Sequence, residues 1–331
     1  MRVLMHARPG SDRVLAGDAV QARGTAAALK DLGVQADLIE GDSLPDPADY
    51  DLVHLFNLIP VEGTYAAFTA SINAGKRVVL STVFWDPSAF LARWDHGGEF
   101  GAWWDRTNEL RRKILNGACL ILPNGRAELD CLNRAFGPLP PYYLVPNGVD
   151  PAIFRPRPRR SGVEPHILCV GRISPRKNQL GLLEALRGTG IAVHFVGPVN
   201  DFAYYRDCRA AAWSGVRFLP ETRGSRLAAL YADASVHALV SWYETPGLAS
   251  LEAAACGCRV VSTAWGCAKE YLQDKAWYCR PDDPADIRRA VLAAMAAPEP
   301  AGLSEMVRAR FNWTEAAKAT LAAYGEAVKG R

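Results

Sequence analysis

The stretch at residues 241–257, SWYETPGLASLEAAACG, is the centre of the interpretation because it predicts a helix start beside two carboxylates. Thr245 is a favourable N-cap and Pro246 suits the first helical position, so we expect a helix from about residue 246 that ends at Gly257. The unpaired N–H groups at a helix start attract anions such as phosphate. The stretch therefore predicts a phosphate site.

Two carboxylates flank this predicted helix start. Glu244 precedes it, and Glu252 lies about two turns inside the helix. At this spacing the two groups address different parts of one elongated ligand rather than sharing a proton. Gly247 leaves room for close approach of the backbone. A solvated loop residue and an ordinary helix residue explain the two positions equally well, so the rest of the chain has to decide.

Length and composition predict a soluble protein with two domains. The chain has 331 residues, 49% hydrophobic and 22% charged, which supports two cores of ordinary size. No stretch approaches the roughly 20 apolar residues of a membrane span, and the N-terminal residues lack the apolar segment of a secretion signal. We therefore expect a cytoplasmic chain.

Charge and cysteine content exclude several classes of partner. Residues 1–150 carry 14 Lys and Arg against 18 Asp and Glu, whereas residues 151–331 carry 24 against 17, which favours an anionic ligand on the second half. No dense basic face or nucleic-acid motif accompanies this charge, so no nucleic-acid partner is expected. The last four of the eight cysteines match no paired zinc spacing, so we expect reduced thiols and no metal (Cys256, Cys258, Cys267 and Cys279).

Short apolar runs alternate with helical patterns along the whole chain. This order predicts an α/β fold with two doubly wound parallel sheets, whose ligands bind beyond the C-terminal ends of the strands. The expected strands are residues 2–7, 33–39, 51–56, 76–81, 119–122 and 142–145, then 166–170, 192–196, 216–219, 236–240 and 259–262.

The proline-rich and arginine-rich residues 146–165 predict a linker between the two sheets. The expected domains are therefore residues 1–155 and 156–305, followed by a C-terminal helix at 306–331 that packs across both.

A second candidate phosphate contact follows the first strand of the second domain. Residues 171–178, GRISPRKN, contain Arg172, which can grip phosphate oxygens as a fork, and Lys177, which adds a point charge. Together these side chains suit a diphosphate. A solvated basic turn is the alternative.

Three of these segments together resemble retaining GT-B glycosyltransferases of the GT4 type. They are VPNGVDPAIF at 145–154, VGRISPRKNQ at 170–179, and ETPGLASLE at 244–252 followed by AAACG; residues 227–241 and 311–324 add support. The resemblance covers the second domain almost completely and the first mainly in its order of elements. It implies two Rossmann-like domains facing across a cleft, with the acceptor on the first domain and a nucleotide sugar on the second.

The resemblance also implies roles for individual residues. Arg172 and Lys177 would bind the donor diphosphate and stabilise it as it leaves, Glu244 would lie near the transferred sugar, and Glu252 would hold the ribose hydroxyls. The amides of Gly247 and Leu248 would assist. Fixed cations and helix-end amides stabilise the negative charge that develops on a leaving diphosphate, so neither a metal nor a cofactor is expected.

The first domain departs from the family pattern in two places. Its loop at residues 8–17 lacks the usual adjacent glycine pair, although Gly10 or Gly17 would let the backbone approach a phosphate. Where many relatives carry a histidine, this chain has STVFWD at 81–86, which makes Asp86 a candidate acceptor-side base. Two alternatives stay open: Asp86 caps the loop ahead of Pro87, or the leaving phosphate accepts the proton.

Aromatic and basic residues gather at 93–113. Contact with a membrane that bears a lipid-linked acceptor, an ordinary core with a solvated helix face, and stacking of an acceptor sugar are three open interpretations. We expect a transferase that moves a hexose from a nucleoside-diphosphate sugar to a glycan or lipid-linked glycan, in bacterial surface polysaccharide synthesis. A nucleotide-sugar epimerase of the same build and a non-catalytic, glycosyltransferase-like scaffold are the alternatives.

Overall fold

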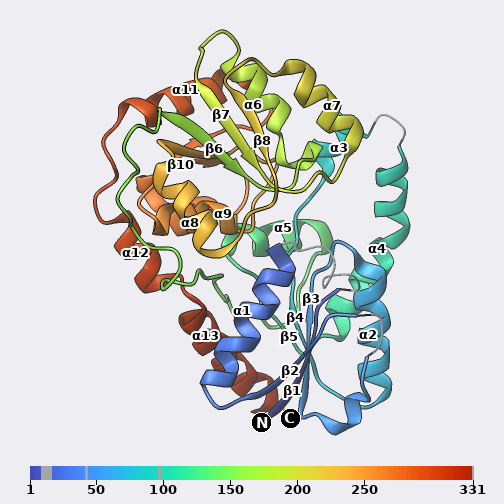
Figure 1. The fold of residues 1–331 in the computed structure, drawn as a ribbon. Helices are drawn as coiled ribbons and strands as arrows, with labels where there is room; N and C mark the ends of the chain where they lie inside the picture. Colours follow the sequence, from blue (N-terminus) through green and yellow to red (C-terminus); the bar gives the residue numbers. More distant parts are fainter. Residues whose placement is uncertain (9–16, 42–43, 96–97, 330–331) are drawn as a thin grey trace. The chain divides into compact units, whose positions relative to one another are not determined.

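The computed structural model describes residues 1–8, 17–41, 44–95 and 98–329. The chain divides into two compact units, the first formed by Met1–Gly148 together with Trp313–Arg331 and the second by Val149–Asn312 (Figure 1). These bounds differ by several residues from the boundaries at 155 and 305 that the composition suggested. The C-terminal helix belongs to the first unit.

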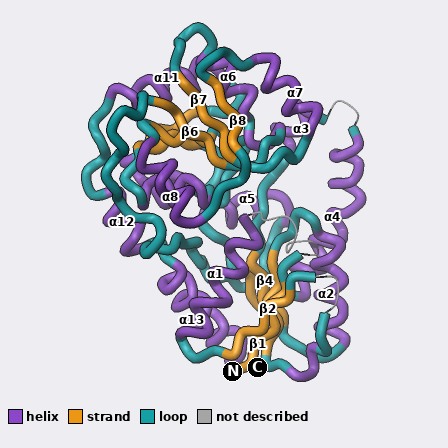
Figure 2. The backbone as a smooth tube through the Cα atoms, viewed as in Figure 1, coloured by secondary structure: helices purple, strands orange, loops and turns teal. Residues whose placement is uncertain are grey.

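The first unit contains one parallel sheet with helices on its faces (Figure 2). Its elements are β1 (Arg2–His6), α1 (Gly17–Asp31), β2 (Gln35–Ile39), η1 (Pro47–Asp49), β3 (Leu52–Phe56), α2 (Val61–Asn73), β4 (Val78–Ser81), α3 (Ser88–Trp94), α4 (Glu99–Gly117), β5 (Leu120–Ile121), α5 (Arg126–Phe136) and α13 (Trp313–Lys329). The strands lie in the order β2-β1-β3-β4-β5, so successive strands are added on one side of β1 and then, from β3 on, on its other side. Every residue of β3 and β4 is buried, as a strand covered on both faces requires.

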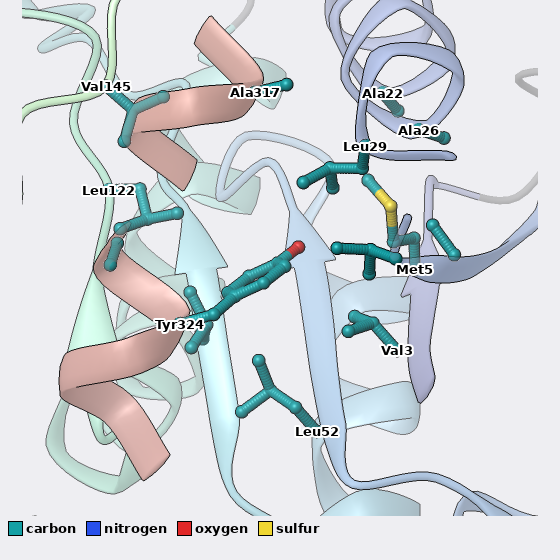
Figure 3. Packing of buried hydrophobic residues seen from close by; sticks show 14 of the residues in the cluster. Val3, Met5, Ala22, Ala26, Leu29, Leu52, Leu122, Val145, Ala317 and Tyr324 are labelled. Carbon is teal, nitrogen blue, oxygen red and sulfur yellow. The ribbon is translucent and has the colours of Figure 1, made fainter. Parts of the chain in front are cut away.

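Helix α13 completes the core of the first unit. Figure 3 shows Tyr324 and Ala317 of α13 against the same apolar cluster as Leu29 of α1 and Leu52 of β3. The Tyr324 hydroxyl lies 2.6 Å from Nδ1 of His54, so the phenol has a partner inside the core. Residues far apart in the sequence therefore share one buried surface.

The second unit contains a six-stranded parallel sheet. Its elements are β6 (His166–Val170), η2 (Pro175–Lys177), α6 (Gln179–Leu186), β7 (Ala192–Val196), α7 (Phe202–Ala211), β8 (Val216–Leu219), α8 (Gly224–Asp233), β9 (Val236–Leu239), α9 (Leu248–Ala255), β10 (Arg259–Thr263), α10 (Ala268–Leu272), η3 (Gln273–Lys275), β11 (Trp277–Cys279), α11 (Pro284–Ala296) and α12 (Leu303–Arg310). The order β11-β10-β9-β6-β7-β8 reverses between β6 and β9. Both sheets confirm the predicted α/β doubly wound fold.

One predicted strand was wrong and one strand was missed. Residues 142–145 form no strand: Tyr142 makes an isolated bridge with Ile121, and the N–H groups of Tyr143 and Val145 donate to the carbonyls of Ile121 and Pro123 at 3.0 Å each. Pro140 and Pro141 just before this segment lack the N–H donors that a ladder needs, and β5 offers only two residues to pair with. Strand β11 was missed because three residues are too short to show a period.

The predicted linker and terminal helix are also corrected. From Val149 onward, the linker belongs to the second unit. It has no helix or strand, but Phe154 is buried and Arg160 pairs with Asp233 at 2.6 Å. Within the segment at 306–331, the terminal helix itself is α13, which begins at Trp313. The residues before it are the end of α12 and a turn in which Asn312 donates to the carbonyl of Arg308 at 2.9 Å.

Candidate functional site

The loops that follow β6 and β9 meet at the point where the order of the second sheet reverses. The strands are adjacent and parallel, so their C-terminal ends lie at the same edge of the sheet, where ligands of such sheets bind. The two loops are joined directly: the Trp242 N–H donates to the carbonyl of Arg176 at 3.0 Å, and Arg176 Nη2 donates to the carbonyl of Tyr243 at 3.1 Å. The fold thus unites the two predicted phosphate segments.

A buried ion pair links the two loops. Lys177 Nζ donates to Glu244 Oε1, and only 14% of the lysine side chain and 6% of the glutamate side chain are exposed. Burial by itself raises the pKa of Glu244, but the charges of Lys177 and Arg176 outweigh it, so its pKa lies below the ordinary value. Arg172 is close enough to act electrostatically on Lys177. An ionised carboxylate therefore lies beside Lys177 and Arg176, and Arg172 acts on the lysine of this pair.

The loop after β6 is held in place by Asn178. This residue has a left-handed conformation with φ of 58°, and its Nδ2 donates to the carbonyls of Val240 at 3.1 Å and Pro281 at 2.8 Å. The carbonyl of Arg172 accepts from Gln179 Nε2 at 2.8 Å. These bonds fix the backbone that carries the cations, which is the condition for electrostatic preorganisation.

The backbone of Glu244 is fixed by the loop after β10. Its N–H donates to the carbonyl of Trp265 at 3.3 Å, and its carbonyl accepts from the Cys267 N–H at 2.8 Å. Gly266 between them has φ of 104°, and a Cβ there would lie 2.1 Å from the carbonyl oxygen of Glu244. No motif in the sequence predicted this support, although Gly266 after a predicted strand was a signal for it.

The start of α9 corrects the predicted cap. The helix begins at Leu248 with Gly247 as its N-cap, so Thr245 is not the cap and Pro246 lies before the helix. Gly247 has φ of 90°, a conformation that propensities for Thr and Pro do not reveal. The first-turn N–H groups of α9, near Gly247 and Leu248, lack partners within the helix and suit an anion.

The end of α9 is as predicted. Gly257 has φ of 86°, its N–H donates to the carbonyl of Ala254, and the Cys258 N–H donates to that of Ala253, both at 3.0 Å. This is a Schellman motif, which satisfies the last carbonyls of the helix.

Glu252 has a different environment from Glu244. It is partly buried in α9 and accepts a hydrogen bond from the Tyr231 hydroxyl at 3.0 Å. Burial raises the pKa of Glu252 to about 7, against the lowering effect of Tyr231. The two carboxylates thus have separate partners and pKa values shifted in opposite directions, which agrees with the prediction that they share no proton.

The candidate residues of the first unit do not form a comparable cluster. Asp86 is exposed and accepts from the N–H of Ser88 at 2.9 Å and from its hydroxyl at 2.6 Å, so it holds the turn around Pro87, the N-cap of α3. Its role as a base stays a prediction. Gly17 is the exposed first residue of α1, whereas Gly10 lies outside the described residues.

Glu128 is a buried carboxylate that the sequence analysis missed. It accepts from the Thr82 hydroxyl at 2.5 Å, from the Phe84 N–H at 2.8 Å and from the Asn124 N–H at 2.8 Å. These bonds tie the loop after β4, which leads to Asp86, to the loop after β5. A single glutamate in a helical pattern does not indicate that its carboxylate links two loops, so the sequence could not predict this role.

The basic and aromatic segment is only partly core: Trp104 and Arg111 are buried, whereas Arg93 and Arg106 are exposed. Arg111 has no exposed surface, its guanidinium lies 3.8 Å from the centre of the Trp104 ring, and it donates to the carbonyl of Leu58 at 2.9 Å. Burial lowers the pKa of Arg111 to about 10. This arginine is therefore not available to a membrane surface, while Arg112 and Lys113 are exposed.

The cysteines are free thiols, seven of them buried. Within the described ranges, no three His, Cys, Asp or Glu side chains gather in a way that could hold a metal ion. The described helices include none with the length and apolarity needed to cross a membrane.

The two doubly wound units place the chain in the GT-B class of folds, as comparison with solved structures confirms. It superposes on the sucrose-phosphate synthase of Thermosynechococcus elongatus with a TM-score of 0.82 at 16% identity, covering 100% of both chains. For HepE of Anabaena in complex with UDP-glucose, the TM-score is 0.80 at 15% identity, covering 98% of this chain and 100% of that one.

Within that class, residues 164–297 match the model of the family "Glycosyl transferases group 1". The chain is 30% identical over 251 residues to the D-inositol 3-phosphate glycosyltransferase of Paenarthrobacter aurescens, which is 68% of this chain and 62% of that protein. The chain thus spans less than two thirds of this relative. It belongs to the group 1 glycosyltransferases and is GT4-like, as the motifs predicted.

Proposed function

We propose that the protein is a retaining glycosyltransferase that moves a hexose from a nucleoside-diphosphate sugar to a glycan or lipid-linked glycan of a bacterial surface polysaccharide. The observation that carries the proposal is the buried cluster of Lys177 and Glu244 with Arg172 and Arg176 beside the start of α9. The family match includes all of these residues. A cytoplasmic location, with peripheral membrane contact where the acceptor is lipid-linked, completes the proposal.

The cluster suits cleavage of a bond between a sugar and a diphosphate. The leaving diphosphate gains negative charge, which Arg172, Lys177 and the N–H groups at the start of α9 stabilise from fixed positions. Positive charge develops on the anomeric carbon, and the ionised Glu244 lies on the same cluster to stabilise it. When the donor binds, the Lys177 ammonium donates to the phosphate oxygens as well as to Glu244.

The other end of the donor would lie along α9. Glu252 is on the second turn of that helix, and its carboxylate can accept hydrogen bonds from the vicinal ribose hydroxyls. The complex of HepE with UDP-glucose supports this donor class by analogy of fold. On the acceptor side, Asp86 is proposed as the base, with proton transfer to the leaving phosphate as the alternative.

Calorimetric titration with UDP, GDP and ADP tests the donor site. We expect one of them to bind, and Lys177→Ala and Glu252→Ala each to weaken that binding at least tenfold, because each removes a hydrogen bond that involves a charged group. Lys318→Ala is the matched control, since this lysine forms an exposed pair with Glu315 in the first unit. Unchanged affinity in both site variants would refute the donor site.

Product analysis separates the proposal from its alternatives. A transferase gives a glycosylated acceptor with the anomeric configuration of the donor, and slow release of nucleotide when the acceptor is absent. New isomers of the sugar nucleotide from donor alone would indicate an epimerase. Nucleotide binding with no turnover of any sugar nucleotide would favour the scaffold.

A further inference from the structure

Tyr231 is a buried residue of α8 to which the proposed reaction assigns no role. It has no exposed surface, and its hydroxyl donates to Glu252 Oε2 at 3.0 Å. Among the described residues, the Glu252 carboxylate accepts one hydrogen bond, and Tyr231 donates it. A link between residues of two helices, 21 positions apart, fixes a carboxylate that otherwise has several rotamers.

The Tyr231 ring is itself held by two aromatic neighbours. His237 of β9 packs edge-on against it with ring centroids 5.5 Å apart. Phe154, from the segment predicted to be a linker, packs in the same way with centroids 6.2 Å apart. His237 is fully buried, and burial lowers its pKa to about 3, so it adds no charge near neutral pH. The phenol therefore has a fixed direction, towards Glu252.

We propose that Tyr231 is a positioning residue that presents the Glu252 carboxylate to the ribose hydroxyls of the donor; this rests on the proposed function. A carboxylate has two oxygens and about four acceptor sites. Tyr231 occupies one site on Oε2, which leaves Oε1 and the rest of Oε2 for two vicinal hydroxyls. Because the side chain is already oriented, donor binding loses less rotamer entropy.

The same bond tunes the charge of Glu252. Burial raises its pKa to about 7 and the Tyr231 hydroxyl opposes the rise, so the group changes charge near neutral pH. Two neighbouring groups keep their charge there: burial raises the pKa of the Cys256 thiol to about 12 and lowers that of His237 on β9 to about 3. The elements packed on α9 also carry charged side chains, namely Arg226 and Asp233 on α8, Arg259 on β10, and Glu305, Arg308 and Arg310 on α12.

A protonated Glu252 has one acceptor oxygen fewer for the diol. Donor affinity is therefore expected to fall as the pH drops through about 7. Loss of the Tyr231 hydroxyl removes the effect that lowers the pKa, so the midpoint of this fall should move to higher pH.

Tyr231→Phe tests the role by calorimetry with whichever of UDP, GDP and ADP binds, and with its 2′-deoxy analogue, between pH 5.5 and 8.5. We expect about tenfold weaker binding of the ribonucleotide at pH 7, a higher pH midpoint, and reduced preference for the 2′-hydroxyl. Tyr204→Phe is the matched control, because Tyr204 is also buried in the second unit and its hydroxyl accepts from the Leu180 N–H at 2.8 Å. It should change stability but not the pH midpoint.

A second measurement applies even if Tyr231→Phe does not fold. In protein labelled with ¹³C at the tyrosine Cζ, one resonance should shift near pH 7 and lose that shift in Glu252→Gln. Absence of such a resonance overturns the proposal, as does a Tyr231→Phe variant with an unchanged midpoint and unchanged 2′-hydroxyl preference. If the wild type binds none of the three nucleotides, the proposed function itself is wrong and the inference falls with it.

Discussion

The pairing of Lys177 with Glu244 dominates the energetics of the site at the scale of single residues. Removing one member of a buried pair leaves the other charge without compensation, which destabilises proteins far more than the loss of a surface pair does. Both side chains are less than one sixth exposed. The pair is therefore expected to matter for folding as well as for binding.

Glu244→Gln should lower the free energy of unfolding by about 2–4 kcal/mol, because Lys177 stays buried without a counter-charge. Urea titration at pH 7 measures this. Glu315→Gln is the matched control in an exposed pair with Lys318, for which about 0–1 kcal/mol is expected. Equal effects of the two substitutions would contradict the importance of burial.

The effect of Glu244→Gln should also depend on pH. The folded-state pKa of Glu244 lies below its ordinary value, so its contribution is complete above the unfolded-state pKa and is lost as the pH falls through the folded-state pKa. The stability difference between wild type and variant should thus be constant from pH 6 to 8 and shrink below about 4.5. Urea titrations at a series of pH values check this, and a difference that grows in acid would contradict the assigned direction.

At the scale of secondary-structure elements, two glycines of the first unit show how helix packing limits the sequence. Gly24 lies in α1, where a Cβ would be 2.4 Å from the Trp313 ring of α13. Gly325 lies in α13, where a Cβ would meet nothing within 4 Å. Alanine has a better helix propensity at both positions by about 1 kcal/mol, so packing alone decides the sign of each substitution.

Gly24→Ala should destabilise the protein by about 1–3 kcal/mol, because overpacking against a rigid ring outweighs the gain in propensity. Gly325→Ala should stabilise it by about 0.5–1 kcal/mol. Thermal unfolding of the two variants beside the wild type tests both signs. A stabilised Gly24→Ala variant would mean that α1 and α13 are not in contact as described.

The sequence predicted elements well where the physical signal is local. Strand β6 was predicted with its observed bounds because continuous apolar residues bounded by turns mark a buried strand. The cap of α9 was missed because the positive φ of Gly247 depends on the fold around Glu244. The hydrogen bond between Tyr231 and Glu252 joins residues 21 positions apart, so local sequence patterns could not predict it.

At the scale of the whole molecule, the two units differ in how the chain builds them. The second unit is continuous, from Val149 to Asn312, and contains the four side chains proposed to bind the donor, Arg172, Lys177, Glu244 and Glu252. The first unit is discontinuous and needs α13, whose Ala317, Ala323 and Tyr324 are buried in its core cluster. We therefore expect that a truncation which disrupts the core of the first unit leaves the candidate donor site of the second unit in place.

Deletion of residues 313–331 should unfold the first unit and leave nucleotide binding by the second intact. The deletion exposes the apolar surface that α13 covers. Burial of apolar surface stabilises the fold by about 25 cal/mol per Å², so even one helical turn of buried side chains contributes several kcal/mol to the free energy of unfolding. A fragment of residues 149–312 should fold alone, since it keeps a complete parallel sheet with its helices. Circular dichroism and calorimetry with the nucleotide that binds the full chain test both. A folded fragment without affinity for that nucleotide would show that the donor site requires residues outside 149–312, and would contradict the assignment of donor binding to the second unit.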